Sequence, residues 1–151
     1  MTAPRIASRD EWLTARKQLL AEEKAHSRAG DALAAKRRQL PWVEVTKDYQ
    51  FQADDGEKTL SDLFGPHSQL IIQHFMFAPG ADAGCALCCL WADNFNPMIE
   101  HFGARDVAFA AVSRAPVGDF QPFKARMGWS FDWVSSHGSA FNFDYQASAS
   151  E

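Results

Sequence analysis

The chain has 151 residues, of which 46% are hydrophobic and 13% aromatic, enough to bury the core of one domain. Its formal net charge of −4 argues against nucleic acid as a partner. The chain starts without an apolar run typical of a signal peptide, and no segment is apolar enough to span a membrane, so we expect a cytoplasmic protein with no membrane partner.

The first forty residues predict a helical arm. Residues 8–11 have the spacing of a capping box, and an apolar run begins just after them at Trp12. The apolar stripe along the arm is thin and is surrounded by charged residues, so we expect the arm to pack by one side only. Gly30 and Asp31 indicate a break, followed by a second helical piece that Pro41 stops.

From residue 42 the pattern becomes typical of strands, which places a second domain over residues 41–151. Residues 42–51 alternate and are rich in Val, Tyr and Phe. Residues 54–56 form a turn signal between two short extended runs. A single helical turn should follow, capped by Ser61 and ended by Gly65.

Three buried strands separated by helices make up the rest of this domain. Residues 70–77 form a nearly continuous apolar run, as expected of a strand covered on both faces, and residues 107–113 and 131–136 are similar. The helices between them run from Cys85 to Gly103 and over residues 118–128. Crossovers of this length predict parallel, right-handed strand connections.

Both helices carry signals for where they begin, bend and end. Asn96 and Pro97 should interrupt the first helix and restart it. Asp119 is a candidate cap for the second helix, and Gly128 is its expected stop.

Chemistry is expected where the parallel strands end, because ligands in open α/β sheets usually bind at that edge. The edge carries Cys85, Arg114 and His137. Cys85 would lie at the amino end of a helix, where free N–H groups and the helix dipole stabilise a thiolate and lower its pKa. Cys88 lies one turn later, close enough to resolve a mixed disulfide. Arg114 could hold a thiolate or a substrate anion, whereas His74, within a predicted strand, is expected to be a hydrogen-bonded core histidine.

Other roles for the cysteines remain open. Cys85, Cys88 and Cys89 are the only cysteines in the chain. A small buried hydrophobe is an equally ordinary role for cysteine, and it is the more natural one for Cys89. The three thiols with Asp82 or His137 could also bind a metal, although a closed zinc site usually draws on a second pair of cysteines that this chain lacks.

Six stretches together resemble the thioredoxin-like family catalogued as domain of unknown function 899. They fall within residues 40–145 and read LPWVEVTKDYQF, LSDLFG, SQLIIQHFMF, GCALCCLWADNF, VAFAAVSRAP and FKARMGWSFDWVSSHGSAFNFDY. The resemblance implies a thioredoxin-like α/β fold, with a βαβαβ parallel core and helices on both faces, and a predicted dithiol–disulfide oxidoreductase activity. The C-x-x-C motif of the family maps onto Cys85 and Cys88.

The sequence is more distantly similar to peroxiredoxins, and it departs from both patterns. Cys89 stands where the family usually has a small polar residue. Asp82 stands where peroxiredoxins carry a threonine, three residues before the reactive cysteine, and a carboxylate there would oppose a thiolate.

The end of the sequence lacks an expected signal. The resemblance implies a last strand hairpin, opened by a cis-proline that faces the cysteines, and a last helix, but no proline follows Pro122. We therefore expect a C-terminally incomplete thioredoxin-like domain. Phe141, Phe143 and Tyr145 alternate as in an extended segment, and an uncovered sheet edge would favour self-association into a homo-oligomer and weaken exchange.

The sequence therefore predicts a thiol–disulfide oxidoreductase that uses no metal or other cofactor. Cys85 and Cys88 would be catalytic, with Arg114, His137 and Cys89 as supporting groups. Its partners would be thiols and disulfides, either proteins or small molecules. The alternatives are a thiol peroxidase, a non-enzymatic metal-binding redox sensor, and a structural module that keeps the fold without the chemistry.

Overall fold

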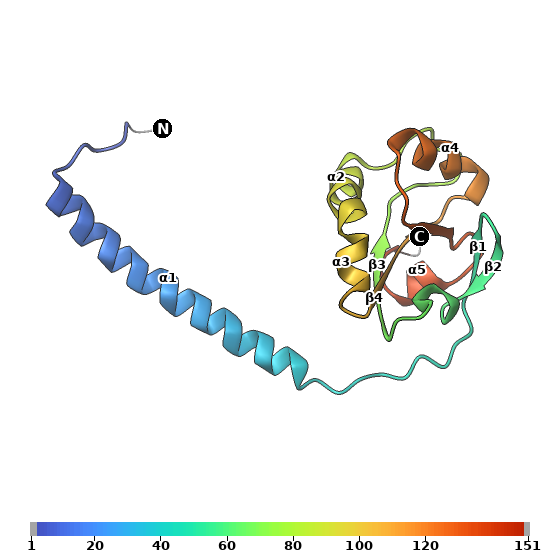
Figure 1. The fold of residues 1–151 in the computed structure, drawn as a ribbon, viewed down its shortest axis with the longest axis horizontal. Helices are drawn as coiled ribbons and strands as arrows, with labels where there is room; N and C mark the ends of the chain where they lie inside the picture. The colour runs from blue at the N-terminus through green and yellow to red at the C-terminus, as the bar shows by residue number, and fades with distance from the viewer. Residues whose placement is uncertain (1–2, 150–151) are drawn as a thin grey trace. The chain divides into compact units, whose positions relative to one another are not determined.

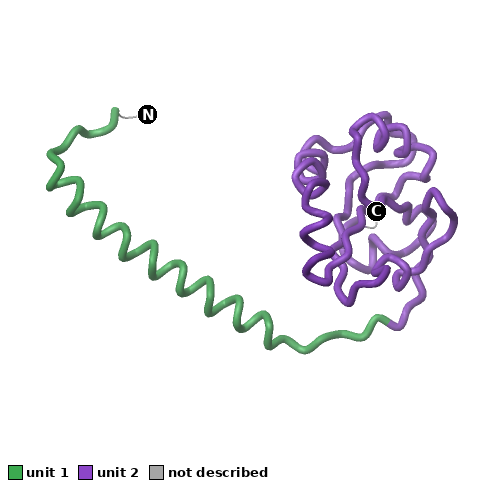
Figure 2. Tube along the Cα trace, viewed as in Figure 1, with its two compact units in different colours: residues 1–45 green, residues 46–151 purple. Residues whose placement is uncertain are grey.

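The computed structural model describes residues 3–149, and the chain divides into two compact units, residues 1–45 and residues 46–151 (Figure 2). The first unit contains one long helix, and the second contains a mixed α/β fold (Figure 1). All three cysteines belong to the second unit. Within residues 3–149, no helix has a stretch both long and apolar enough to cross a bilayer.

Helix α1 (Arg9–Arg38) makes up most of the first unit. The predicted capping box is confirmed: Glu11 N–H donates to Ser8 Oγ at 3.3 Å, and Ser8 N–H donates to a Glu11 carboxylate oxygen at 2.9 Å. The predicted break at Gly30 and Asp31 is wrong, because the helix continues through both residues. A single glycine costs a helix about 1 kcal/mol, too little to interrupt thirty residues rich in Ala, Arg and Lys.

The second unit opens with a hairpin of β1 (Gln50–Ala53) and β2 (Gly56–Thr59). The predicted turn is confirmed at this position, but the strand predicted over residues 42–51 forms only at its end. Residues 42–49 are not strand, and Trp42 and Val43 are exposed. A segment with strand propensity forms a strand only where a neighbouring strand pairs with it, and none pairs with residues 42–49, although Tyr49 at their end packs into the core.

The short 3-10 helix η1 (Asp62–Phe64) is the predicted helical turn, and Gly65 ends it with a positive φ of 54°. Ser61 does not cap it, contrary to expectation. Thr59 does so instead, since its hydroxyl oxygen accepts the N–H of Asp62 at 3.2 Å while the Asp62 carboxylate accepts the Thr59 N–H at 2.7 Å.

The sheet has five strands in the order β2-β1-β5-β4-β3. Strand β4 (Val107–Ser113) pairs in parallel with β3 (Gln69–His74) on one side and β5 (Asp132–Ser135) on the other. The hairpin joins this parallel core through an antiparallel pairing of Gln52 with Ser135. The predicted parallel strand–helix–strand–helix–strand core is therefore confirmed.

Strand β3 ends at His74, earlier than the residues 70–77 predicted, but the chain beyond it stays beside β4. Phe75 N–H donates to the carbonyl oxygen of Val112 at 2.8 Å, and Ala115 N–H donates to that of Phe77 at 3.1 Å. These bonds fix the path of the chain as it leaves the sheet toward the cysteines.

The helices of this unit are α2 (Ala86–Phe95), η2 (Asn96–Met98), α3 (Ile99–Gly103), α4 (Val117–Met127) and α5 (Phe141–Asp144). As predicted, the helix after the cysteines is interrupted around Pro97 and ends at Gly103. Gly128 ends α4 in the left-handed conformation, with a φ of 71°. Asp119 does not cap α4; its carboxylate accepts the backbone N–H of Gly80 at 2.8 Å.

Helices cover both faces of the sheet (Figure 1). Helices α2, α3 and α4 lie over one face, where the aromatic core contains Phe75, Phe77, Phe109, Phe120, Phe123, Trp129, Phe131 and Trp133. Helices η1 and α5 lie over the other face, where the core contains Tyr49, Phe51, Leu63, Ala110, Val112, Val134 and Phe141. Successive side chains of β4 enter the two cores alternately, which explains why its sequence is apolar almost throughout.

Helix α5 corrects the extended segment predicted from the spacing of Phe141, Phe143 and Tyr145. The segment is helical from Phe141 to Asp144. Phe141 is fully buried, with its ring centroid 4.8 Å from that of Phe51. A helical turn also brings the ring centroids of Phe141 and Tyr145 within 4.6 Å of each other, so the aromatic spacing suits a helix as well as a strand.

Candidate functional site

The segment that follows β3 brings the first cysteine to the start of α2. Cys85 is the residue that precedes the first helical turn, and its N–H donates to the carbonyl oxygen of Met76 at 3.1 Å. Gly84 just before it packs against Phe75 and Phe77 so closely that a Cβ atom would overlap the Phe75 ring. Glycine is therefore the only residue that lets Cys85 lie against the end of β3 without displacing the core.

The position of Cys85 favours its thiolate. Its pKa is lowered, chiefly by the backbone N–H groups of Cys88 and Leu87 at the start of α2 and also by the Cys88 side chain, while burial acts in the opposite direction. These N–H groups have no partner within the helix, so they are free to stabilise negative charge on sulfur. Cys85 is half-buried, which leaves its sulfur reachable.

Cys88 lies one turn along α2 and 3.9 Å from Cys85, and both are free thiols. Burial raises the pKa of the Cys88 thiol, and the nearby Cys85 also raises it. The sulfur of Cys88 accepts the N–H of Met76 at 3.5 Å, and its carbonyl oxygen accepts a side-chain N–H of Gln73 at 3.0 Å. The two thiols therefore have opposite characters: one is accessible and acidic, and the other is buried and protonated.

Cys89 differs from both. It is half-buried and packs against the aromatic core beneath α2. Burial raises the pKa of its thiol, and the charge of Asp93 raises it further. These surroundings give Cys89 the features of a packing residue.

Arg114 and His137 follow β4 and β5, and the structure brings them together. The Nδ1 atom of His137 lies 3.2 Å from the carbonyl oxygen of Arg114, and the Arg114 guanidinium lies 5.0 Å from the ring centroid of Phe143. Both residues are exposed. Neither contributes to the lowered pKa of Cys85, so the sheet edge gathers two separate pairs: the thiols on the α2 side, and Arg114 with His137 on the α5 side.

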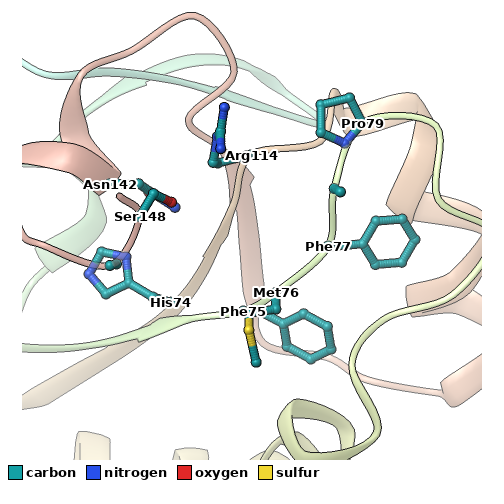
Figure 3. Close-up of a pocket in the computed structure, with 10 residues that line it drawn as sticks. His74, Phe75, Met76, Phe77, Pro79, Arg114, Asn142 and Ser148 are labelled. Carbon is teal, nitrogen blue, oxygen red and sulfur yellow. The ribbon is translucent and has the colours of Figure 1, made fainter. Parts of the chain in front are cut away.

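A cavity of about 240 Å³ lies next to this edge, and no sequence motif predicts it. Figure 3 shows His74, Arg114, Asn142 and Ser148 around it, while the rings of Phe75 and Phe77 point away into the core. Burial lowers the pKa of His74, and the neighbouring Asn142 side chain acts in the opposite direction. The hints in the sequence are Arg114, already a candidate for holding an anion, and His74, which with Gln73 interrupts a largely apolar run.

In the described part of the chain, residues 3–149, no three His, Cys, Asp or Glu side chains are grouped so that they could hold a metal ion. The structure therefore offers the three thiols no additional ligand from Asp82 or His137.

A family model described as "Bacterial protein of unknown function (DUF899)" matches residues 1–151, the whole chain. No curated protein matches the sequence.

Solved structures of other proteins are similar to this chain. A cysteine-to-serine mutant of PrxQ from Xylella fastidiosa is 19% identical, with a TM-score of 0.52 over 74% of this chain and 70% of that one. A candidate protein disulfide isomerase from Bacteroides thetaiotaomicron is also 19% identical, with a TM-score of 0.48 over 70% of this chain; the chain spans only 64% of that protein. At such identities the likeness concerns the fold alone, and that fold is thioredoxin-like.

Proposed function

Because the chain belongs to the bacterial family described as DUF899 and has a thioredoxin-like fold, we propose that it is a thiol–disulfide oxidoreductase. Cys85 is the attacking thiolate and Cys88 is the resolving thiol. One observation carries this proposal: two free thiols lie 3.9 Å apart, and their pKa values are shifted in opposite directions by their surroundings. An exchange enzyme needs this division between a thiolate ready to attack and a thiol held in reserve.

The reaction proceeds in two displacements. The Cys85 thiolate attacks one sulfur of a substrate disulfide, and the other substrate sulfur leaves as a thiolate that takes up a proton. The Cys88 thiol then loses its proton and attacks the Cys85 sulfur, which releases the second substrate thiol and leaves a Cys85–Cys88 disulfide. Two electrons pass from the protein to the substrate, and the reverse sequence oxidises a substrate dithiol.

The backbone of Met76 supports both steps. Its carbonyl oxygen fixes the N–H of Cys85, and its N–H group contacts the sulfur of Cys88. When Cys88 becomes a thiolate in the second step, the same N–H group stabilises the charge that develops on its sulfur. Cys89 has the supporting role of filling the core beneath the pair.

Three single variants test the assignment. Cys85→Ser should abolish reduction of a small disulfide, and Cys88→Ser should stop at a mixed disulfide on Cys85 that mass spectrometry can detect. Cys89→Ser is the matched control, because it removes a neighbouring thiol and should retain exchange. Thiols that are inert in the native protein would support a structural module, and bound zinc in elemental analysis would support the metal-binding sensor.

A thiol peroxidase is the second candidate, favoured by the likeness to the PrxQ fold. A peroxide would convert the Cys85 thiolate to a sulfenic acid, which Cys88 would then resolve as a disulfide with loss of water. Asp82 stands three residues before Cys85, at the position where peroxiredoxins carry a threonine, so the hydroxyl group of that family is missing here. We therefore expect hydrogen peroxide to oxidise Cys85 more slowly than a small disulfide does. Stopped-flow comparison of the two oxidants decides between the candidates.

A further inference from the structure

The cavity beside the sheet edge is built by three parts of the chain that are distant in sequence. The end of β3 and the residues after it form one wall, from His74 to Pro79 (Figure 3). Arg114, just after β4, forms a second wall. Asn142 of α5 and Ser148 close the third side. The parallel core and α5 position these walls, so the cavity belongs to the fold and not to one loop.

The charge around this cavity has one sign. Arg114 contributes a permanent positive charge, and none of the described residues that line the cavity is acidic, although the chain as a whole has a net charge of −4. A second hollow, of about 410 Å³, shares Pro79 and Arg114, contains His137 and also has no acidic residue among those described in its lining. Arg114 thus stands between two hollows that both favour an anion.

One buried polar atom in the wall lacks a hydrogen-bond partner. Nδ1 of His74 is buried and has no hydrogen-bond partner among the residues that the structure describes. Asn142 is 6% exposed, and its Oδ1 accepts the hydroxyl of Ser136 at 2.9 Å, which leaves the amide NH2 group to donate. An unpaired buried polar atom costs about 1–3 kcal/mol, so a ligand that hydrogen-bonds to this ring nitrogen gains from meeting it. A carboxylate is an acceptor-only group with four lone-pair sites, so it suits the Arg114 guanidinium and the Asn142 amide, and it suits the His74 ring in the tautomer that carries its proton on Nδ1.

Met76 connects the cavity to the thiols. Met76 is one of the lining residues and is 62% exposed. Its backbone is hydrogen-bonded to Cys85 and contacts the sulfur of Cys88. A ligand seated in the cavity therefore lies against the residue whose backbone holds both cysteines.

We propose that this cavity binds the carboxylate of a small disulfide or thiol and so selects the substrate class of the Cys85–Cys88 pair, an inference that rests on the proposed exchange reaction. Arg114 and Asn142 hold the carboxylate, and Cys85 attacks the nearer sulfur of the bound disulfide. The products are two carboxylate-bearing thiols and the protein disulfide, so the disulfide substrate is the oxidant and no other reactant is needed.

A series of three disulfides of similar length separates charge from reactivity: 3,3′-dithiodipropionate is a dianion, bis(2-hydroxyethyl) disulfide is neutral, and cystamine is a dication. On the wild-type protein, we expect Cys85 to react with the dianion about tenfold faster than with the neutral compound, which corresponds to about 1.4 kcal/mol of selective binding. Without the cavity the order should reverse, because a thiolate repels an approaching anion.

The matched variants are Arg114→Gln and Arg126→Gln. Both side chains lie over a phenylalanine ring, Arg114 over Phe143 and Arg126 over Phe123, but only Arg114 lines the cavity. Arg114→Gln should lower the ratio of the dianion rate to the neutral rate to about one or below, and Arg126→Gln should keep the wild-type ratio. A ratio near one in the wild-type protein, or an unchanged ratio in Arg114→Gln, would overturn the proposal.

A binding measurement tests the cavity independently of the exchange reaction. A protein with both Cys85→Ser and Cys88→Ser cannot exchange, so 3,3′-dithiodipropionate can be titrated while the His74 ring and the Asn142 amide are followed by NMR. We expect both signals to shift with the dianion and not with cystamine. Selective binding without any exchange in the wild-type protein would refute the proposed function and leave the cavity assignment standing. Exchange without selective binding would refute the cavity assignment and leave the proposed function standing.

Discussion

The backbone N–H of Cys85 donates to the carbonyl oxygen of Met76 at 3.1 Å, which holds the backbone of Cys85 beside the residues that follow β3. The N–H of the same Met76 contacts the sulfur of Cys88 at 3.5 Å. One residue at the end of a strand therefore sets the positions of both thiols. This arrangement fixes the two sulfurs before a substrate arrives, so little ordering is required during the reaction.

Selective alkylation should identify Cys85 as the acidic thiol. Its pKa is lowered in the folded protein, so its thiolate forms at a lower pH than that of an ordinary free thiol, and iodoacetamide at mildly acidic pH should label it first. Cys88 and Cys89, whose pKa values are raised, should require more alkaline solution. Mass mapping after brief labelling checks this order, and unfolding in urea should abolish it. Preferential labelling of Cys89 in the native protein would refute the assignment.

Mild oxidation should join Cys85 to Cys88. Cys89 is the competitor, because it is also about one turn from Cys85, but its side chain packs against the core. Peptide mapping should find the Cys85–Cys88 disulfide in the wild-type protein and in Cys89→Ser. If Cys88→Ser still forms an intramolecular disulfide as fast as the wild-type protein, Cys89 is the resolving thiol.

Gly84→Ala should damage both stability and reactivity. The added Cβ would overlap the Phe75 ring and lie 3.4 Å from Phe77, so either the core or the cysteine loop has to move. We expect a loss of about 1–3 kcal/mol in the free energy of unfolding and slower alkylation of Cys85. Gly118→Ala is the control, since no described atom apart from its chain neighbours and the backbone of its own helix lies within 4 Å of the place that its Cβ would take. Urea unfolding that gives equal stabilities for the two variants would contradict this prediction.

Ser113→Ala should destabilise the sheet beneath the site. Its hydroxyl donates to the carbonyl oxygen of Phe75 at 2.7 Å and accepts the indole N–H of Trp133 at 2.9 Å, and all of these groups are buried. Removal of the hydroxyl leaves two buried polar groups unpaired, for a loss of about 2–4 kcal/mol in the free energy of unfolding. Ser61→Ala, at an exposed serine without a capping hydrogen bond, should change stability by less than about 0.5 kcal/mol. Thermal unfolding of both variants provides the comparison.

The open edge of β3 should promote self-association. Among the strands that the structure describes, β3 pairs only with β4, and the six residues of β3 include no Lys, Arg, Asp or Glu that would discourage a second strand. Light scattering should show a mass that rises with protein concentration, and Ile71→Lys should reduce this rise. Val43→Lys, at an exposed apolar residue outside the sheet, is the control. A wild-type protein that stays monomeric at every concentration would contradict this prediction.

The parallel core could be predicted because its signals are local and strong. Residues 107–113 are apolar almost throughout, since β4 is covered on both faces, and the predicted bounds match the strand. Gly128 could be identified as a helix stop because a residue that tolerates a positive φ fits that position. The place of Cys85 at the start of α2 followed from its position directly after a buried strand.

The features that could not be predicted depend on contacts between residues that are far apart in the sequence. The helical form of Phe141–Asp144 is decided by Phe141 packing against Phe51, a residue far away in the sequence. The cavity depends in the same way on Arg114 and Asn142 meeting the end of β3. Gly30 within α1 is the opposite case, because the many good helix formers around it outweigh one local helix breaker.

The antiparallel pairing of Gln52 with Ser135 also affects how the protein matures as it leaves the ribosome. The hairpin of β1 and β2 is synthesised early, yet a two-stranded hairpin is barely stable alone, and its place beside β5 does not exist until most of the chain has emerged. The cysteine segment is synthesised between these two events. Its three thiols therefore meet the surrounding redox buffer before Cys88 and Cys89 are buried, and the nascent chain has to remain reduced through that interval to reach the native arrangement.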